Sequence, residues 1–261
     1  MAEYKKVKYY FDKKLAKLIA GKVKQVYPKF RSNDFVKTIA DSVDDLELKA
    51  RVAIITDALR EFLPADFEVA MKILLRILGP ENENEKGMFT EGYWLMPVAY
   101  FVEKYGCDDF DTSIAAIYEI TKRHTGEYAV RPFLERYPAK MLSVMKDWSK
   151  DRSFHVRRLA CEGVRPRLPW AKKMEQFLND PTPVLPILEN LKEDESLFVR
   201  KSVANNLNDI LKDNYEIGIR VLKKWSRSKS EETKWIIRHA LRNEIRKGNS
   251  EAQQLINKIK I

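Results

Sequence analysis

The sequence predicts an all-α protein, an α-solenoid of HEAT-like helix pairs with a basic concave face. Three observations support this fold class. Only 9 glycines and 11 prolines occur in 261 residues, which is typical of long regular elements. Apolar residues recur at helical spacing in several segments. A two-helix pattern repeats along the second half, and such pairs stack on one another to bury their apolar stripes.

The first elements we expect are basic helices within residues 1–38. This segment holds eleven Lys or Arg residues against three Asp or Glu residues. Its apolar residues at helical spacing are Phe11, Leu15, Leu18, Ile19 and Val26. A membrane-surface helix would fit this pattern too. Helices packed on the body, with their lysines toward a polyanion, agree better with the basic balance elsewhere.

Four further helices are expected before residue 124. The first two are Leu46–Leu63, ended by a proline, and Phe67–Leu78, ended by a glycine and a proline. After the acidic loop ENENEKG (residues 81–87) come Tyr93–Tyr105 and Ser113–Arg123. Residues 81–119 hold nine acidic side chains and two basic ones, whereas residues 120–261 hold eighteen and thirty. This segregation of charge indicates a nucleic-acid partner.

The clearest repeats lie in residues 125–248. DRSFHVRR (residues 151–158) aligns with DESLFVRK (residues 194–201), and a helix precedes each copy. A weaker copy starts at GIRVLKKW (residues 218–225), and an earlier one lies at residues 127–131. Stacking should align the second helices of the pairs along one face. The row predicted there contains Arg158 and Glu162, then Lys201, Asn205 and Asp209, then His239 and Asn243.

The stretch Phe154–Trp170 is expected to form the working surface. It begins as an amphipathic helix, with Val156, Leu159 or Ala160, and Gly163 on one face, and Arg158 and Glu162 on another. It then breaks into VRPRLPW (residues 164–170). With two prolines, two arginines and a tryptophan, this segment is too rigid and too basic for a filler loop.

The usual catalytic motifs are absent from the sequence. His124, His155 and His239 show no HExxH spacing, and Cys107 and Cys161 form no CxxC or Cys–His arrangement. A P-loop, a GxGxxG and a GxSxG are also missing. The two cysteines thus suggest neither a disulfide framework nor a zinc site.

Three carboxylates, those of Glu127, Glu162 and Asp209, remain as candidates for chemistry. Each of them also has a structural explanation. Glu127 can interact favourably with a helix dipole. Glu162 can pair with Arg158, and Asp209 can form a local cap or salt bridge. The functional explanation is that a groove for phosphates tolerates carboxylates only beside a cation. A base alkylated on a ring nitrogen is such a cation, and it leaves as a neutral molecule. Carboxylates need only stabilise the oxocarbenium-like sugar and position a water.

The chain resembles the AlkC-type bacterial DNA alkylation repair glycosylases, relatives of the AlkD type built from HEAT-like repeats. The resemblance covers nearly the whole chain. Its matching segments are HVRRLACEGVRPRLPW (155–170), TGEYAVRPFLERYP (125–138), SLFVRKSVANNLNDI (196–210) and TKWIIRHALRNEIRKG (233–248), with weaker matches in LELKARV and GYWLMPVAYFVEKYG. Cys161 and Val164 depart from the serine and threonine more common in the family.

The resemblance implies a DNA glycosylase that removes N3-methyladenine, and 3-methylcytosine or 1-methyladenine, from double-stranded DNA without flipping the base. No metal or cofactor takes part. Glu162 and Asp209 fall where the catalytic acids are expected, with Glu127 and Arg158 beside them. Arg165, Arg167 and Trp170 would contact or shape the DNA. Further DNA contacts are predicted from the repeated rows, at Arg157, Arg200, Lys201, Asn205, Arg238 and His239.

We expect a single domain over residues 1–261, monomeric, without an obligate protein partner, in the bacterial cytoplasm or nucleoid. No apolar run is long enough for a signal peptide or a membrane span. Some family members carry a C-terminal immunoglobulin-like domain, and we expect none here because the sequence ends in a helical pattern. Two alternatives stay open: a non-catalytic HEAT scaffold that binds nucleic acid or protein, and an AlkD-type specificity for bulkier or purely purine lesions.

Overall fold

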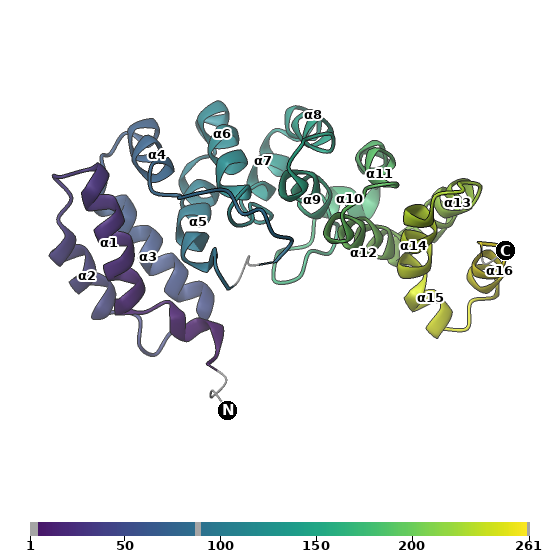
Figure 1. Ribbon diagram of the computed structural model, residues 1–261, viewed down its shortest axis with the longest axis horizontal. Helices are drawn as coiled ribbons and strands as arrows, with labels where there is room; N and C mark the ends of the chain where they lie inside the picture. The colour runs from purple at the N-terminus through teal and green to yellow at the C-terminus, as the bar shows by residue number, and fades with distance from the viewer. Residues whose placement is uncertain (1–4, 87–89, 260–261) are drawn as a thin grey trace. The chain divides into compact units, whose positions relative to one another are not determined.

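The computed structural model describes residues 5–86 and 90–259, and every regular element in these ranges is a helix (Figure 1). Predictions that include residues 1–4, Gly87, Lys260 or Ile261 lie outside the described residues at those positions. The chain forms two compact units, Met1–Phe133 and Leu134–Ile261. In the described part of the chain no helix is both long and apolar enough to cross a lipid bilayer.

The first unit is built from helices that pack in sequence order, with α1 on α2, α2 on α3, α3 on α5, and both α4 and α5 on α6. Its elements are η1 (Val7–Tyr10), α1 (Lys13–Val26), α2 (Ser32–Ala40), α3 (Leu48–Phe62), α4 (Phe67–Leu75), η2 (Tyr93–Leu95), α5 (Met96–Tyr105) and α6 (Phe110–Thr121). A short helix, α7 (Arg131–Arg136), crosses the boundary to the second unit.

Several helix ends in this unit differ from the sequence prediction. Helix α4 ends at Leu75, because the chain already turns toward Gly79, whose φ of 78° is left-handed. Helix α6 begins at Phe110, three residues early, since the Asp109 carboxylate accepts the Thr112 N–H and caps the helix. Leu18 was predicted in the apolar stripe of α1, but it is 42% exposed.

The second unit consists of stacked helix pairs, α8 with α9, α11 with α12, and α13 with α14. Within this unit, α8, α11 and α13 form one row and α9, α12 and α14 the other (Figure 1). Its elements are α8 (Pro138–Trp148), α9 (Phe154–Glu162), α10 (Glu175–Asn179), η3 (Thr182–Val184), α11 (Leu185–Leu191), α12 (Leu197–Asp213), α13 (Tyr215–Trp225), α14 (Glu231–Ala240), α15 (Arg242–Arg246) and α16 (Ser250–Ile259). Neither α10 nor the separation of α15 from α14 was predicted.

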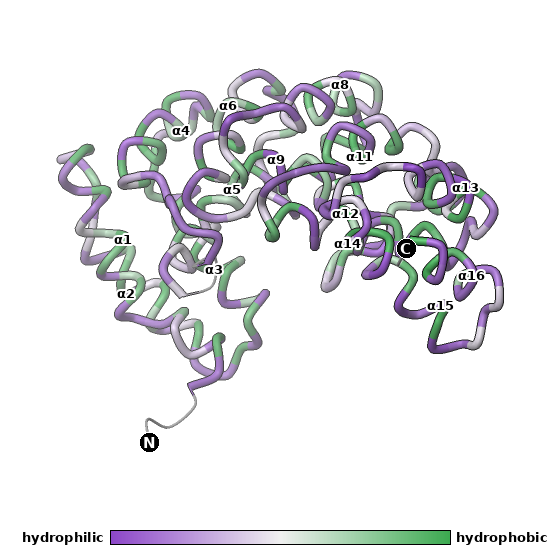
Figure 2. Tube along the Cα trace, turned by 45° about the vertical axis from the view of Figure 1, so that its right-hand side comes forward, coloured by the Kyte–Doolittle hydropathy of each residue, from purple (hydrophilic) through white to green (hydrophobic). Residues whose placement is uncertain are grey.

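The sequence repeat reappears as a repeated local structure. Before α9 the Ser153 N–H donates to Asp151 Oδ1 at 2.7 Å, and before α12 the Ser196 N–H donates to Asp194 Oδ1 at 2.9 Å. Such turns stop the chain and start the next helix. Hydrophobic and hydrophilic residues alternate along the helices, the pattern of helices with one buried face (Figure 2). Buried residues of α9, α12 and α14 include Val156, Leu159, Val199, Val203, Ile236 and Ile237.

The prediction of an all-α chain built from repeated helix pairs is therefore confirmed for the described residues. The basic concave face stays a prediction, and so does the single functional domain. The second helices of the pairs carry most of the predicted site residues, and α12 lies against both α9 and α14. These three helices are thus the frame of the candidate site.

Candidate active site

Glu162 and Arg165 meet at the point where α9 ends. Glu162 is the last residue of α9, and the chain turns back at once, with the Arg165 N–H donating to the Glu162 carbonyl at 3.2 Å. This turn brings the Arg165 guanidinium over the neighbouring carboxylate, where Nη1 donates to Glu162 Oε1 at 2.6 Å. Both side chains are nearly withdrawn from solvent, with 5% of Glu162 and 8% of Arg165 exposed.

Helix α12 supplies Ser202 and Asp209, which are seven residues apart and therefore share one helix face. Arg165 Nε donates to Asp209 Oδ2 at 2.8 Å, and Ser202 Oγ donates to Glu162 Oε2 at 2.5 Å. The other carboxylate oxygen of Asp209, Oδ1, lies 3.9 Å from Lys212 Nζ. One guanidinium thus joins two of the three carboxylates that were predicted as candidates for chemistry.

Burial and ion pairing act in opposite directions on these carboxylates. Burial alone would raise the pKa of Glu162, but the charges of Arg158 and Arg165 and the Ser202 hydrogen bond outweigh it and lower that pKa. For Asp209, burial outweighs the ion pair with Arg165, and the pKa is raised. Glu162 is therefore the more firmly ionised of the two, and Asp209 is the more readily protonated.

The sequence analysis explained these carboxylates by a cationic substrate. In the structure, arginines of the protein also pair with them. Arg158 Nη2 lies 3.6 Å from Glu162 Oε1, and its guanidinium carbon lies 5.1 Å from the centre of the Phe198 ring. Together with Arg165, it supplies two positive charges to two negative ones. Local ion pairing, the structural explanation of the acids, is thus met at Glu162, whereas Asp209 pairs with Arg165 from the turn after α9.

Glu127 belongs to the first unit and lies in the turn before α7, four residues ahead of its first helical residue. Its backbone N–H donates to Thr125 Oγ1 at 3.2 Å, and Thr125 Oγ1 donates to Glu127 Oε2 at 3.0 Å. Only 5% of Glu127 is exposed. The residue is therefore held by a local turn rather than by a helix start, and its catalytic role stays a prediction.

Arg157 and Arg200, both predicted to bind DNA, link one repeat to the next. Arg157 donates from Nε and Nη2 to the Asp194 carboxylate at 2.6 and 3.1 Å, and Arg200 Nη1 lies 3.6 Å from Glu232 Oε1. Asp194 stands just before α12, and Glu232 stands in the first turn of α14. The repeated arginine thus reaches an acid at the start of the next second helix, which gives its repetition a structural cause.

Arg167 and Arg238 have carboxylate partners as well. Arg167 forms a bidentate contact with the Asp213 carboxylate, donating from Nε at 2.7 Å and from Nη2 at 2.6 Å. Arg238 Nη2 lies 3.9 Å from Glu231 Oε2. The predicted DNA contacts of these arginines stay predictions. Each would have to share its charge between DNA and an acid of the protein.

Trp170 projects from the loop between α9 and α10. The loop is closed by the Met174 N–H, which donates to the Pro166 carbonyl at 3.0 Å, and anchored by Leu168 and Met174, which are buried. Trp170 is 69% exposed, and its φ of 62° makes it the one non-glycine residue with left-handed backbone in the described part of the chain. An exposed ring on strained backbone is typical of a functional position.

Arg242, which the sequence analysis missed, lies near the remaining residues that were predicted to contact DNA. These residues are Lys201, Asn205 and His239. Arg242 Nη2 donates to Asn205 Oδ1 at 2.8 Å. The repeat alignment extended α14 as far as Asn243, but α14 ends at Ala240, and Arg242 starts a new helix. No signal in the repeat pattern marks this break.

Buried amides that were also missed fix α12 between its neighbours. Asn206 Nδ2 donates to the Cys161 carbonyl at 2.9 Å, and Asn208 Nδ2 donates to the Ala240 carbonyl at 2.7 Å. The closely spaced asparagines in the middle of a helix are the sequence signal that could have indicated them. They set the register of α12 against α9 and α14, and hence the meeting of Asp209 with Arg165.

Cys161, beside Glu162, is fully buried, and burial raises the pKa of its thiol to about 12. It is therefore a thiol at neutral pH and is not set up as a nucleophile. Among residues 5–86 and 90–259, no three His, Cys, Asp or Glu side chains are grouped so that they could hold a metal ion.

Comparison with known proteins gives three similarities. The sequence profile of the family described as "DNA alkylation repair enzyme" matches residues 123–243. The uncharacterized protein YhaZ of Bacillus subtilis (strain 168) is 40% identical over 256 residues, which are 98% of this chain and 68% of that protein. The structure of Pseudomonas fluorescens alkylpurine DNA glycosylase AlkC bound to DNA containing an abasic site analog matches with a TM-score of 0.89 and 35% identity, over 97% of this chain and 69% of that chain.

Proposed function

Because this chain belongs to the family of DNA alkylation repair enzymes, and to its AlkC type, we propose that it hydrolyses the N-glycosidic bond of alkylated bases in duplex DNA. The observation that carries the proposal is the meeting of Glu162 and Asp209 on the guanidinium of Arg165. The AlkC relative was solved on DNA with an abasic-site analog, and an abasic site is what base removal leaves. This supports DNA as the partner and base release as the reaction.

The charge of the substrate follows from the chemistry of the leaving group. A base alkylated on a ring nitrogen is positively charged, and it leaves as a neutral molecule when it takes both electrons of the glycosidic bond. The sugar becomes an oxocarbenium-like cation, which water attacks. Carboxylates fixed beside it stabilise that charge, and their burial strengthens the effect. We infer that cationic lesions are preferred: N3-methyladenine, with 3-methylcytosine and 1-methyladenine.

We infer that the two acids have different tasks. Glu162 accepts hydrogen bonds at both oxygens, from Arg165 and from Ser202, and its lowered pKa keeps it charged. Asp209 has one oxygen on Arg165, while its Oδ1 has only a 3.9 Å contact. Burial raises its pKa, which makes it the better proton acceptor. Asp209 is accordingly assigned to position the water and take its proton, and Glu162 to stabilise the sugar cation.

This reaction does not need the base to leave the stack for a closed pocket. The acids act on the sugar and the attacking water, and the departing base requires no proton. We infer that the enzyme attacks the bond while the base stays in or near the stack, unlike glycosylases that flip their target. A bulky substituent on the lesion should therefore be tolerated.

The test is release of methylated bases from methylated duplex DNA by the wild type, Asp209→Asn, Glu162→Gln and Asp213→Asn. The first two changes should lower the single-turnover rate by about 10²-fold or more, the size typical of losing one preorganised charge. Asp213→Asn is the matched control, because Asp213 lies on the same helix and pairs with Arg167 near the surface. It should release bases at close to the wild-type rate.

A wild type that binds DNA but releases no base would overturn the enzymatic proposal in favour of a binding scaffold. Release confined to bulky or purine lesions would instead indicate AlkD-type specificity. If Asp209→Asn and Glu162→Gln both retain full rates, the assignment of the acids is wrong. Circular dichroism of each variant separates a catalytic loss from unfolding.

A further inference from the structure

Most arginines near the acids are neutralised by the protein itself, and Arg242 differs from them. Carboxylates lie within 4.0 Å of Arg157, Arg158, Arg165, Arg167 and Arg200. Within the described residues, Arg242 has no such partner, since its two acceptors are the neutral oxygens described next. Its positive charge therefore stays available to an anion from outside.

The two acceptors of Arg242 hold its guanidinium in one orientation. Nη1 donates to the His239 carbonyl at 2.6 Å, and Nη2 donates to Asn205 Oδ1 at 2.8 Å. The two bonds tie the side chain at the start of α15 to the end of α14 and to the middle of α12. A guanidinium that is already oriented loses little entropy when it binds a further oxygen pair.

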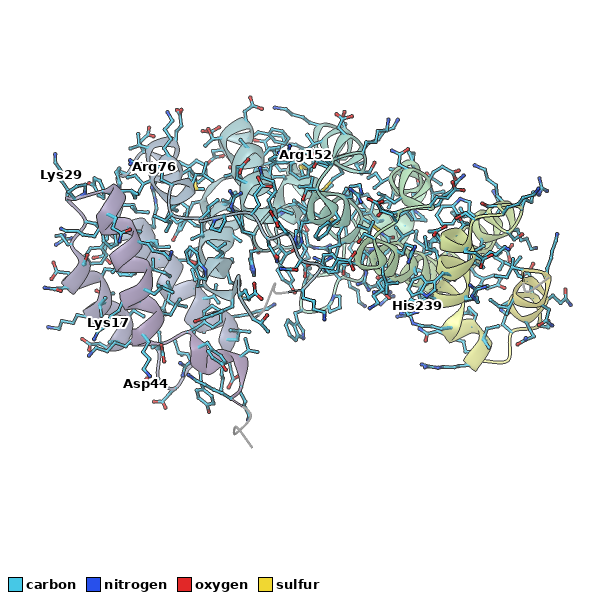
Figure 3. The ribbon with its side chains drawn as sticks, viewed as in Figure 1. Lys17, Lys29, Asp44, Arg76, Arg152 and His239 are labelled. Atoms are coloured by element: carbon cyan, nitrogen blue, oxygen red, sulfur yellow. The ribbon has the colours of Figure 1, made fainter. Side chains whose placement is uncertain are left out.

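Further donors gather around this guanidinium. Lys201 is exposed on α12, and His239 on α14 stacks on Trp235, with ring centres 4.9 Å apart. Burial, then Arg242 and Lys201, lower the pKa of His239. Burial and the charge of Arg165 likewise lower the pKa of Arg242. His239 is labelled in Figure 3, in the second unit. Since like charges repel, this grouping costs stability unless an anion binds to it.

We propose that Lys201, Asn205, His239 and Arg242 form a binding site for one phosphodiester of the DNA strand that carries the lesion. The inference rests on the proposed function and extends it, because it fixes where the backbone lies relative to the acids. Arg242 is close enough to Asp209 and Arg165 for both to act on its charge. A phosphodiester held by Arg242 would therefore lie near the acids assigned to the attacking water and to the sugar cation.

A guanidinium fork, an ammonium and an imidazole suit a phosphodiester, which offers two charged oxygens to several donors at once. Arg242 is thus assigned as the residue that sets the register of the strand. Arg157, Arg167 and Arg200 stay on their own carboxylates. Loss of Arg242 should weaken binding of any duplex, damaged or not, because the contact is to the backbone.

The test measures the affinity of the full chain for a duplex with a tetrahydrofuran abasic analogue, as a function of salt. Arg242→Gln should weaken binding at low salt and lower the slope of log K against log salt by about 0.9, the value for one phosphate contact. Arg242→Lys should keep the slope, since it keeps the charge. Arg220→Gln, an exposed arginine on α13, removes the same charge elsewhere and should leave both quantities unchanged.

A second readout follows the His239 ring by NMR. Helices α12, α13, α15 and α16 pack against α14. Within the described residues, the charged groups that act on the His239 ring are Lys201 from α12 and Arg242 from α15, and none comes from α13 or α16. A bound phosphodiester favours the protonated ring, so duplex binding should raise the pKa of His239. Affinity for the duplex should then increase as the pH falls through the pKa of the complex. Inorganic phosphate alone should produce a smaller rise.

The outcomes separate this inference from the proposed function. If the protein releases methylated bases but Arg242→Gln matches Arg220→Gln in affinity and slope, the phosphodiester site is refuted while the glycosylase stands. If no base is released but Arg242→Gln still loses one unit of slope and the His239 pKa still rises, the site stands without the enzyme. An unchanged His239 pKa on a saturating duplex also refutes the site.

Discussion

At the scale of single residues, Arg165 allows two carboxylates to lie buried side by side. Unpaired, each would be strongly destabilised by the loss of solvent. The guanidinium contacts Glu162 and Asp209 from different nitrogens, so it also fixes the direction of both carboxyl groups. Placement of the acids and stability of the fold therefore depend on the same side chain.

Arg165→Gln should accordingly lower the free energy of unfolding by about 3–5 kcal/mol, the cost of breaking a buried ion pair. Urea denaturation at neutral pH measures this loss. Arg167→Gln is the matched control, because Arg167 forms a similar pair with Asp213 but is more exposed. That variant should lose about 1 kcal/mol or less. Equal losses for both would contradict a supporting role for Arg165.

Only part of this arrangement could be predicted from the sequence. Arg158 and Glu162 are four residues apart on a helix, and this spacing alone predicts that they meet. The pair of Arg165 with Asp209 spans 44 positions and depends on the register between α9 and α12. That register is set by buried amides, and a helical repeat does not specify it. Hence the acids were identified, and their common partner was not.

At the scale of elements, the loop after α9 holds Trp170 in a strained position. Leu168 and Met174 fix the loop on the core, so the left-handed backbone at Trp170 is imposed by its surroundings. For an L-residue this conformation costs about 1–2 kcal/mol. The DNA contact of the exposed Trp170 ring stays a prediction, and strained backbone is typical of functional positions.

Two substitutions separate the ring from the backbone. Trp170→Ala and Trp170→Gly both delete the ring, but only glycine adopts the left-handed conformation without strain. The glycine variant should be more stable than the alanine variant by about 1 kcal/mol in chemical denaturation. Both variants should bind an abasic-analogue duplex more weakly than the wild type. If they bind it equally to the wild type, the ring has no role in DNA contact.

The repeat pattern predicted the elements well where the copies are regular. The pairs α8–α9, α11–α12 and α13–α14 all follow from it. It failed after Ala240, where α14 stops and Arg242 begins a separate helix, because local helix propensity does not encode this break. The alignment therefore predicted that Asn243 lies in the same row as Glu162 and Asp209. In the structure, the Asn243 side chain donates to Asn208.

At the scale of the whole molecule, the net charge is unevenly divided. The second unit holds 27 of the 48 basic and 17 of the 38 acidic side chains, so the net charge of +10 belongs to it. The first unit is balanced, since its basic residues 1–38 are offset by the acidic stretches that follow. Attraction of a polyanion should therefore come mainly from the unit that carries Glu162 and Asp209.

Binding to undamaged duplex DNA should consequently depend steeply on salt. For a protein that neutralises several phosphates, affinity falls by about 10³-fold or more between about 50 and 200 mM salt. Fluorescence anisotropy of a labelled duplex measures this dependence. An affinity that stays constant over the same range would show that the basic residues of the second unit are not used on DNA.

Cys161 adds a consequence of a different kind. The reagents that methylate DNA are electrophiles, and they attack cysteine thiolates as readily as bases. Burial raises the pKa of this thiol to about 12 and leaves it no exposed surface, so it stays protonated at pH 7 and out of reach of reagents. Cys161, the neighbour of Glu162 on α9, is thus protected from the agents that would create the proposed substrate.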